Sequence, residues 1–208
     1  MTKEVDHTSR DHALLSPSSS HRWLKCTPSA RLEEPLPYST SAAAEEGTVA
    51  HELAEYALDK YIKGEYLPLL DELPVPKEIA ENKYYSSEMD KYVTDYVCYV
   101  CDIFEVCGDA KMYLERKFDL TSYVPDCFGS CDCAIEGTNI LNIIDLKYGK
   151  GVRVEAKGNT QLMMYALGVL RSLSPKRQAE IETIKMHIAQ VRLSLIHISE
   201  PTRPISIS

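Results

Sequence analysis

The feature that most constrains the fold is a run of three strand-length segments in the second half of the chain. Residues 111–118, 128–136 and 139–147 each extend over the length of a β-strand, with Pro125 before the second segment. Between the last two, Gly137-Thr138-Asn139 is a tight-turn sequence. We therefore predict a three-stranded meander.

The segments around this meander follow other periods. Apolar residues recur every three or four positions over 45–64, 87–106 and 158–173, which predicts helices, and a shorter helix is expected within 21–32. Residues 181–191 carry β-branched side chains at alternate positions and predict a fourth strand. This order of elements predicts an α/β fold with a mixed central sheet flanked by helices.

Size and composition limit the organisation of the chain. Its 208 residues are 44% hydrophobic, enough for one good core, so we divide it into a helical segment with connector at 1–44 and a core at 45–192. The longest apolar stretches are too short to span a bilayer, and the charged residues 1–13 do not resemble a secretory signal. We expect a cytoplasmic protein without a membrane partner.

The cysteines fit a reducing compartment. There are seven, an odd number that does not suit a closed disulfide framework. Cys98, Cys101 and Cys107 superficially have the spacing of a zinc half-site, but their helical surroundings favour ordinary buried thiols. Cys131 and Cys133 flank Asp132, and alternation along a strand predicts that both point away from its face, toward the core.

Two carboxylates and a lysine carry the chemical argument. Asp132 lies in the second predicted strand, in Gly129-Ser130-Cys131-Asp132, and Asp145-Leu146-Lys147 ends the third. On adjacent antiparallel strands Asp132 and Asp145 can converge on one cation, and alternation puts Lys147 on the same face as Asp145. Carboxylates suit Mg²⁺, which polarises a phosphate and activates an attacking water.

The next helix adds two polar residues at helical spacing. Gln161 and Tyr165 lie four positions apart, so both project from one face and can orient a phosphate beside the metal. The preceding loop concentrates basic residues, including Lys150, and can contact DNA phosphates, although a solvated basic loop is an alternative.

Taken in this order, these features resemble the RecB-like branch of the PD-(D/E)xK nuclease superfamily. The paired Gly-x-x-Asp and Asp-x-Lys motifs are the most specific part of the resemblance, which covers residues 16–192. The N-terminal half, through Trp23 and Cys26 to Gly47-Thr48-Val49-Ala50-His51, also looks like an uncharacterised phage-encoded family of that branch. The resemblance implies a restriction-endonuclease-like core.

The resemblance also implies an activity and a set of ligands. We expect a Mg²⁺- or Mn²⁺-dependent deoxyribonuclease, specifically an exonuclease of phage or prophage DNA metabolism, acting beside a helicase or recombinase. The resemblance implies that Asp132, Asp145 and Lys147 are the catalytic residues. It also implies that the metal ligands are the two carboxylates, the His51 imidazole and the Leu146 carbonyl. Cys26 occupies the place of an iron–sulfur ligand, but the other cluster cysteines of such nucleases follow the core, so a cluster is expected in a full-length protein only.

Two further carboxylates are candidates for supporting roles. Glu55 lies one helical turn after His51 and is expected to support it, with metal binding through a water as the alternative. Glu115 in the first strand is a supporting carboxylate, a metal-binding carboxylate or an exposed strand residue. Single motifs have plainer interpretations as well. An isolated Asp-x-Lys is usually a solvated strand end, and an isolated histidine is usually packed or capping.

Two other functions compete with the nuclease. One is an inactive DNA-binding or scaffolding phage protein that keeps the fold, and the intact Asp132, Asp145 and Lys147 argue against it. The other is a metal-binding interaction module unrelated to nucleic acid, which the net charge of −8 keeps open.

The end of the chain is predicted to have an origin separate from the rest of the protein. Residues 193–203, with the sequence LSLIHISEPTR, resemble the translation of a transposon-end sequencing adaptor that contaminates assembled metagenomic reads. We expect 193–208 to be an artefactual tail that either makes little contact with the core or packs as an extension of it, and the natural protein, truncated here, to continue past about Arg192.

Overall fold

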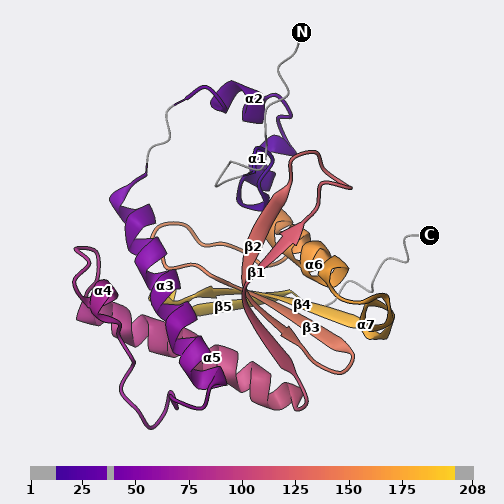
Figure 1. Cartoon of the computed structure of the whole chain (residues 1–208). Coiled ribbons are helices and arrows are strands. Elements are labelled where there is room, and N and C mark those ends of the chain that lie inside the picture. Colours follow the sequence, from indigo (N-terminus) through magenta and orange to yellow (C-terminus); the bar gives the residue numbers. More distant parts are fainter. Residues whose placement is uncertain (1–12, 37–39, 200–208) are drawn as a thin grey trace.

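The fold is a five-stranded mixed sheet packed against helices, which confirms the expected α/β class (Figure 1). The computed structural model describes residues 13–36 and 40–199. The strands lie in the order β1-β2-β3-β4-β5. The first three form the predicted antiparallel meander, β4 runs parallel to β3, and β5 is antiparallel to β4. Their bounds are β1 (Lys111–Asp119), β2 (Phe128–Glu136), β3 (Ile140–Leu146), β4 (Thr183–Gln190) and β5 (Leu195–Ser199).

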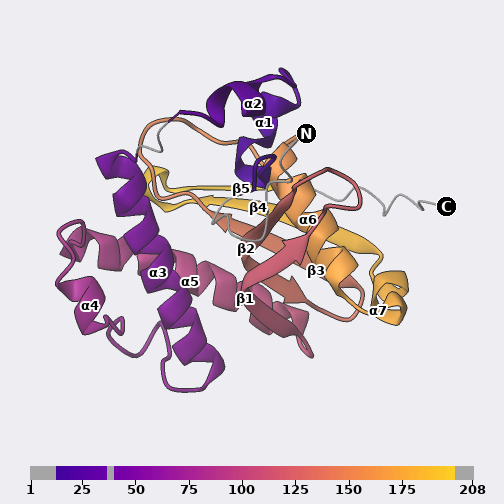
Figure 2. The ribbon, with the colours of Figure 1, turned by 45° about the horizontal axis from the view of Figure 1, so that its top comes forward.

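Three long helices flank the sheet: α3 (Ala42–Ile62), α5 (Ser87–Cys107) and α6 (Thr160–Ser172), each within three residues of its predicted bounds. Helices α3 and α5 cover one face, and α6 lies on the other (Figure 2). The remaining helical elements are short: η2 (Pro17–Ser19), α1 (Ser20–Trp23), α2 (Ser29–Glu33), α4 (Lys77–Ala80), α7 (Pro175–Glu180) and η3 (Val191–Leu193).

Apolar side chains form one cluster on each face of the sheet. Under α3 and α5, the cluster includes Leu53 and Val97 together with Ile144 of β3. Under α6, it includes Val169 together with Ile143. Consecutive residues of β3 thus face opposite clusters, and this burial on both faces is why the strand is an almost continuous apolar run.

The β2–β3 turn is fixed by a close approach at Gly137. Its N–H donates to the Ile140 carbonyl at 2.8 Å, and a Cβ on Gly137 would lie 2.9 Å from Ile140 Cγ2. A side chain at this position would therefore collide with the returning strand. The turn keeps β2 and β3 in the register that brings their other ends, with Asp132 and Asp145, together.

The N-terminal segment differs from the single helix predicted within 21–32. It forms two short helices, α1 and α2, separated by a connection that includes Pro28. Proline lacks an amide hydrogen and disfavours helical conformation in the residue before it, so a continuous helix is interrupted there. A hydrogen bond of 2.6 Å between the Ser20 and Thr160 hydroxyls ties this segment to the start of α6.

The end of the described chain takes the second of the two expected arrangements. Residues 195–199 form β5, which pairs with β4 from Gln190–Leu195 to Met186–Ser199 and so extends the sheet. The edge of β4 offers unpaired backbone groups, and the two β-branched isoleucines of the Leu195-Ile196-His197-Ile198 sequence favour pairing with them. Residues 200–208 lie outside the described residues.

A transmembrane segment was not expected from the sequence. Among the helices that the structure describes, none has both the length and the apolar character needed to cross a membrane.

Candidate active site

Asp132 lies where the regular alternation of β2 breaks down. The β2–β3 register begins at Cys133 opposite Ile144, and on the β1 side Glu115 has a φ of 43°. Cys131 and Cys133 are both fully buried, as predicted, but they belong to apolar clusters on opposite faces of the sheet. The prediction that both point to one face is therefore wrong, because a strand alternates only where its pleat is regular.

Asp145, the last residue but one of β3, is almost completely buried, with 1% of its surface exposed. Lys147 Nζ lies 3.1 Å from Oδ1 in a hydrogen bond and 2.8 Å from Oδ2, so the predicted common face is confirmed. The Oδ2 atom is buried and has no hydrogen-bond partner among the described residues. Burial raises the pKa of the Asp145 carboxyl, Lys147 partly offsets this, and the charge of Asp132 raises the pKa further.

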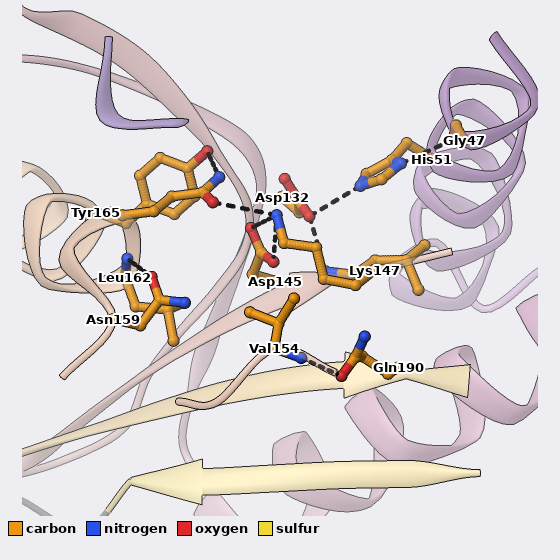
Figure 3. Close-up of polar contacts among 12 residues, drawn as sticks. Gly47, His51, Asp132, Asp145, Lys147, Val154, Asn159, Leu162, Tyr165 and Gln190 are labelled. Atoms are coloured by element: carbon orange, nitrogen blue, oxygen red, sulfur yellow. Dashed lines mark hydrogen bonds and ion pairs between the residues drawn. The ribbon is translucent and has the colours of Figure 1, made fainter. Parts of the chain in front are cut away.

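Asp132 accepts contacts from both sides through one oxygen. Its Oδ2 accepts a hydrogen bond of 2.9 Å from the Leu146 N–H and lies 3.2 Å from Nε2 of His51 (Figure 3). Burial opposes the charged form of Asp132, but the His51 hydrogen bond and charge lower its pKa on balance. The carboxylate thereby replaces a backbone acceptor where the β2–β3 register stops.

His51 is held by its own helix. Its Nδ1 lies 2.8 Å from the Gly47 carbonyl, one turn earlier in α3. A carbonyl only accepts, so Nδ1 carries the hydrogen and Nε2 is the nitrogen that faces Asp132. Burial opposes the charged form, but Asp132 outweighs it and raises the pKa of His51 to about 9. In a metal site, Nε2 would be the ligating atom.

Lys147 continues the contacts toward α6. Its Nζ donates to Oε1 of Gln161 at 3.1 Å, and Nε2 of Gln161 donates to the Tyr165 hydroxyl at 2.7 Å (Figure 3). The predicted helical pair therefore faces the carboxylates as a chain from Asp145 to Tyr165. Asn159 starts α6 by accepting a hydrogen bond of 3.1 Å from the Leu162 N–H.

The two candidate supporting carboxylates lie on the other side of His51. Glu55 and Glu115 line a small cavity of about 10 Å³ together with His51, Asp132 and Leu146. Burial and the charge of Glu115 raise the pKa of Glu55. Glu115 is half-buried, its backbone is in the left-handed region, and this irregular point of β1 lies at the cavity. That the Leu146 carbonyl binds metal stays a prediction.

Other sequence candidates lie apart from this set. Lys150 forms a 3.6 Å ion pair with Glu88 at the start of α5. Cys26 is an exposed free thiol after α1. Burial raises the pKa of Cys101 to about 12, as expected of a packed thiol.

The donor set fits a divalent cation after a rearrangement. Within the described residues, no three or more His, Cys, Asp and Glu side chains already form a group able to hold an ion. The reason is that each carboxylate is paired, Asp132 with His51 and Asp145 with Lys147. Both oxygens of the buried Asp145 nevertheless share a single ammonium, that of Lys147, and two carboxylates with an imidazole are ligands that Mg²⁺ and Mn²⁺ accept.

Gln190, which no sequence pattern singles out, shapes the loop between Lys147 and α6. Gln190 of β4 is buried and accepts a hydrogen bond of 2.7 Å from the Val154 N–H (Figure 3). It also donates one of 2.9 Å to the Val152 carbonyl. No local signal identifies it, because a polar residue at a strand end is ordinary. Asn159, in contrast, follows Gly158 and precedes a helical period, which is a recognisable N-cap signal.

The fold and this site define a class: a mixed α/β protein with a buried carboxylate pair, a lysine and an imidazole at the end of its central strands. The chain belongs to the family described as "Protein of unknown function (DUF2800)", which it matches over residues 12–206. That match includes most of the segment 193–208. Its origin from an adaptor stays a prediction.

Proposed function

We propose that the protein is a metal-dependent deoxyribonuclease of the RecB-like type that hydrolyses phosphodiester bonds. The observation that carries the proposal is the carboxylate pair of Asp132 and Asp145. Asp145 is almost completely buried, both of its oxygens contact the same Lys147 ammonium, and the charge of Asp132 acts on it. Burying two like charges close together is costly, so such a pair is characteristic of sites that bind a cation. The contact chain from Asp145 through Lys147 to Gln161 and Tyr165 supports the same function.

The roles of the side chains follow from their places. Asp132, Asp145 and Nε2 of His51 would hold Mg²⁺ or Mn²⁺, which supplies Lewis acidity and an activated water when bound. Lys147 would exchange its contact with Asp145 for one with the phosphate, since its side chain is only part-buried and its ammonium already spans Asp145 and Gln161. Gln161 and Tyr165 would keep their mutual hydrogen bond and position the same phosphate.

An assay of metal dependence tests this proposal. Purified protein is incubated with linear and with circular DNA in Mg²⁺, in Mn²⁺ and in EDTA. We expect cleavage in at least one of the two cations and none in EDTA. Degradation of linear but not circular DNA would support the finer proposal of an exonuclease.

Three results would count against a metal-dependent nuclease. Cleavage that persists in EDTA would remove the metal from the reaction. DNA binding without cleavage in either cation would favour an inactive DNA-binding or scaffolding protein. Metal binding without any affinity for DNA would favour an interaction module.

A further inference from the structure

A groove opens between the N-terminal segment and the ends of β1 and β2. It encloses about 790 Å³, within the range of roughly 300–1,000 Å³ typical of small-molecule sites. Pro17 and Ser18 line it from η2, Phe118 and Phe128 line it from the strands, and Tyr165 lines it from α6.

The wall that η2 forms is firmly anchored. The Trp23 indole N–H donates to the Ser16 carbonyl at 2.9 Å, and the fully buried Ser20 shares a 2.6 Å hydrogen bond with Thr160 of α6. Opposite, a Cβ on Gly129 would lie 3.3 Å from Pro17 Cγ. The N-terminal segment therefore packs against β2 so closely that only glycine fits at this point without a shift.

The groove adjoins the candidate active site through Tyr165. This side chain lines the groove, and its hydroxyl accepts the hydrogen bond from Gln161 in the chain that ends at Asp145. Its ring also packs edge-on against Phe118, with 5.6 Å between the ring centroids. A molecule in the groove would therefore lie beside the group that we expect to position the phosphate.

The lining matches an uncharged aromatic ligand. Among the described residues that line the groove, the charged ones are Lys117 and Asp119, whose formal charges cancel. Aromatic rings and the hydroxyls of Ser16, Ser18 and Ser130 make up much of the remainder. A phosphate would need a surplus of positive charge, whereas a nucleobase offers a π-face for aromatic rings and polar edges for hydroxyls.

We propose that this groove binds one unpaired nucleobase of the DNA strand whose phosphate enters the carboxylate site. This inference rests on the proposed function and extends it to the form of the substrate. In a duplex the base faces are stacked and paired, so only an unpaired base presents a face to the groove. The protein should therefore prefer single-stranded DNA, or a frayed end, over an intact duplex.

Binding in EDTA tests the groove separately from cleavage. Fluorescence anisotropy gives the Kd of the full chain for short labelled single strands in which one abasic site is moved from position to position. We expect one position at which loss of the base weakens binding by about fivefold or more, the lower range for base–aromatic stacking. Ser18→Trp, which fills the groove from an exposed position, should weaken binding of the intact strand by a similar factor.

The matched control is His21→Trp, an exposed residue of α1 outside the groove lining, which should bind like the unchanged protein. The Ser18→Trp variant should also bind the intact strand no more tightly than it binds the strand that lacks the critical base. The proposed role of the groove would be refuted if the unchanged protein bound intact and abasic strands equally at every position. It would also be refuted if that protein bound a blunt duplex more tightly than a single strand. If cleavage is found and Ser18→Trp has no effect, only the groove fails; base-dependent binding without cleavage would sustain the groove and refute the nuclease.

Discussion

Replacing Asp145 with asparagine should stabilise the protein in the absence of metal. Burial raises the pKa of this carboxyl from its ordinary value of 3.8 to about 6, net of the opposing effect of Lys147. The folded state therefore binds the Asp145 proton more tightly than the unfolded chain does. The stabilisation that this proton gives at low pH is lost as pH rises through the pKa of the folded state. At neutral pH the ionised carboxylate is destabilising.

The size of the effect follows from the shift. One pKa unit corresponds to about 1.4 kcal/mol, which sets an upper limit of about 3 kcal/mol for the cost of the ionised side chain. Asparagine keeps the shape and removes the charge, but its amide must lie beside the Lys147 ammonium. We therefore expect Asp145→Asn to raise the free energy of unfolding by about 1–3 kcal/mol.

Urea unfolding in EDTA at neutral pH measures this change. The matched control is Asp102→Asn on the exposed face of α5, which should change stability by no more than about 0.5 kcal/mol. If Asp145→Asn instead lowers the free energy of unfolding by more than about 1 kcal/mol, the pair with Lys147 is stabilising on balance. That result would refute the claim that the ionised Asp145 carboxylate destabilises the protein in the absence of metal.

Three further predictions concern the surrounding framework. Burial lowers the pKa of His187 to about 4, so the folded state keeps it neutral, and stability should fall by up to about 3 kcal/mol as pH drops from about 6.5 toward 4. His187→Gln should flatten this slope in urea titrations at each pH, and an unchanged slope would assign it to other groups. Gln190→Met removes both hydrogen bonds to the loop after Lys147 and should lower the free energy of unfolding by about 1–2 kcal/mol. The Val154 amide should exchange faster, and unchanged exchange there would show that Gln190 does not hold the loop. Gly168→Ala gains about 1 kcal/mol of helix propensity but places Cβ 2.2 Å from a carbon of the Phe118 ring, so a lower thermal midpoint is expected and a higher one would contradict the packing.

Much of the fold was predictable because local periodicity encodes it. The helical stripes of α3, α5 and α6 and the turn at Gly137 each depend on neighbours in sequence. The two halves of the contact chain from Asp145 to Tyr165 were predictable for the same reason. Strand alternation puts Asp145 and Lys147 on one face, and helical spacing puts Gln161 and Tyr165 on one face. Alternation failed at Cys131 because the irregularity opposite Glu115 depends on backbone dihedral angles that no side-chain pattern reveals.

Features formed by distant segments were not predictable. The groove depends on η2 packing against Gly129, more than a hundred residues later, and β5 depends on the open edge of β4. The pairing of each carboxylate with its own cation was also unforeseen. Sequence spacing shows that Lys147 and Asp145 share a face, but not that the ammonium forms a 2.8 Å ion pair with the carboxylate.

The most direct test of the central claim is the single-turnover cleavage rate of a labelled DNA strand at saturating Mn²⁺, for the unchanged protein and for Asp145→Asn. We predict that the substitution lowers the rate by at least about a hundredfold while circular dichroism and the urea midpoint show an intact fold, because it removes a metal ligand without creating a cavity. Cleavage by Asp145→Asn at the unchanged rate would contradict the assignment of the metal site to this carboxylate.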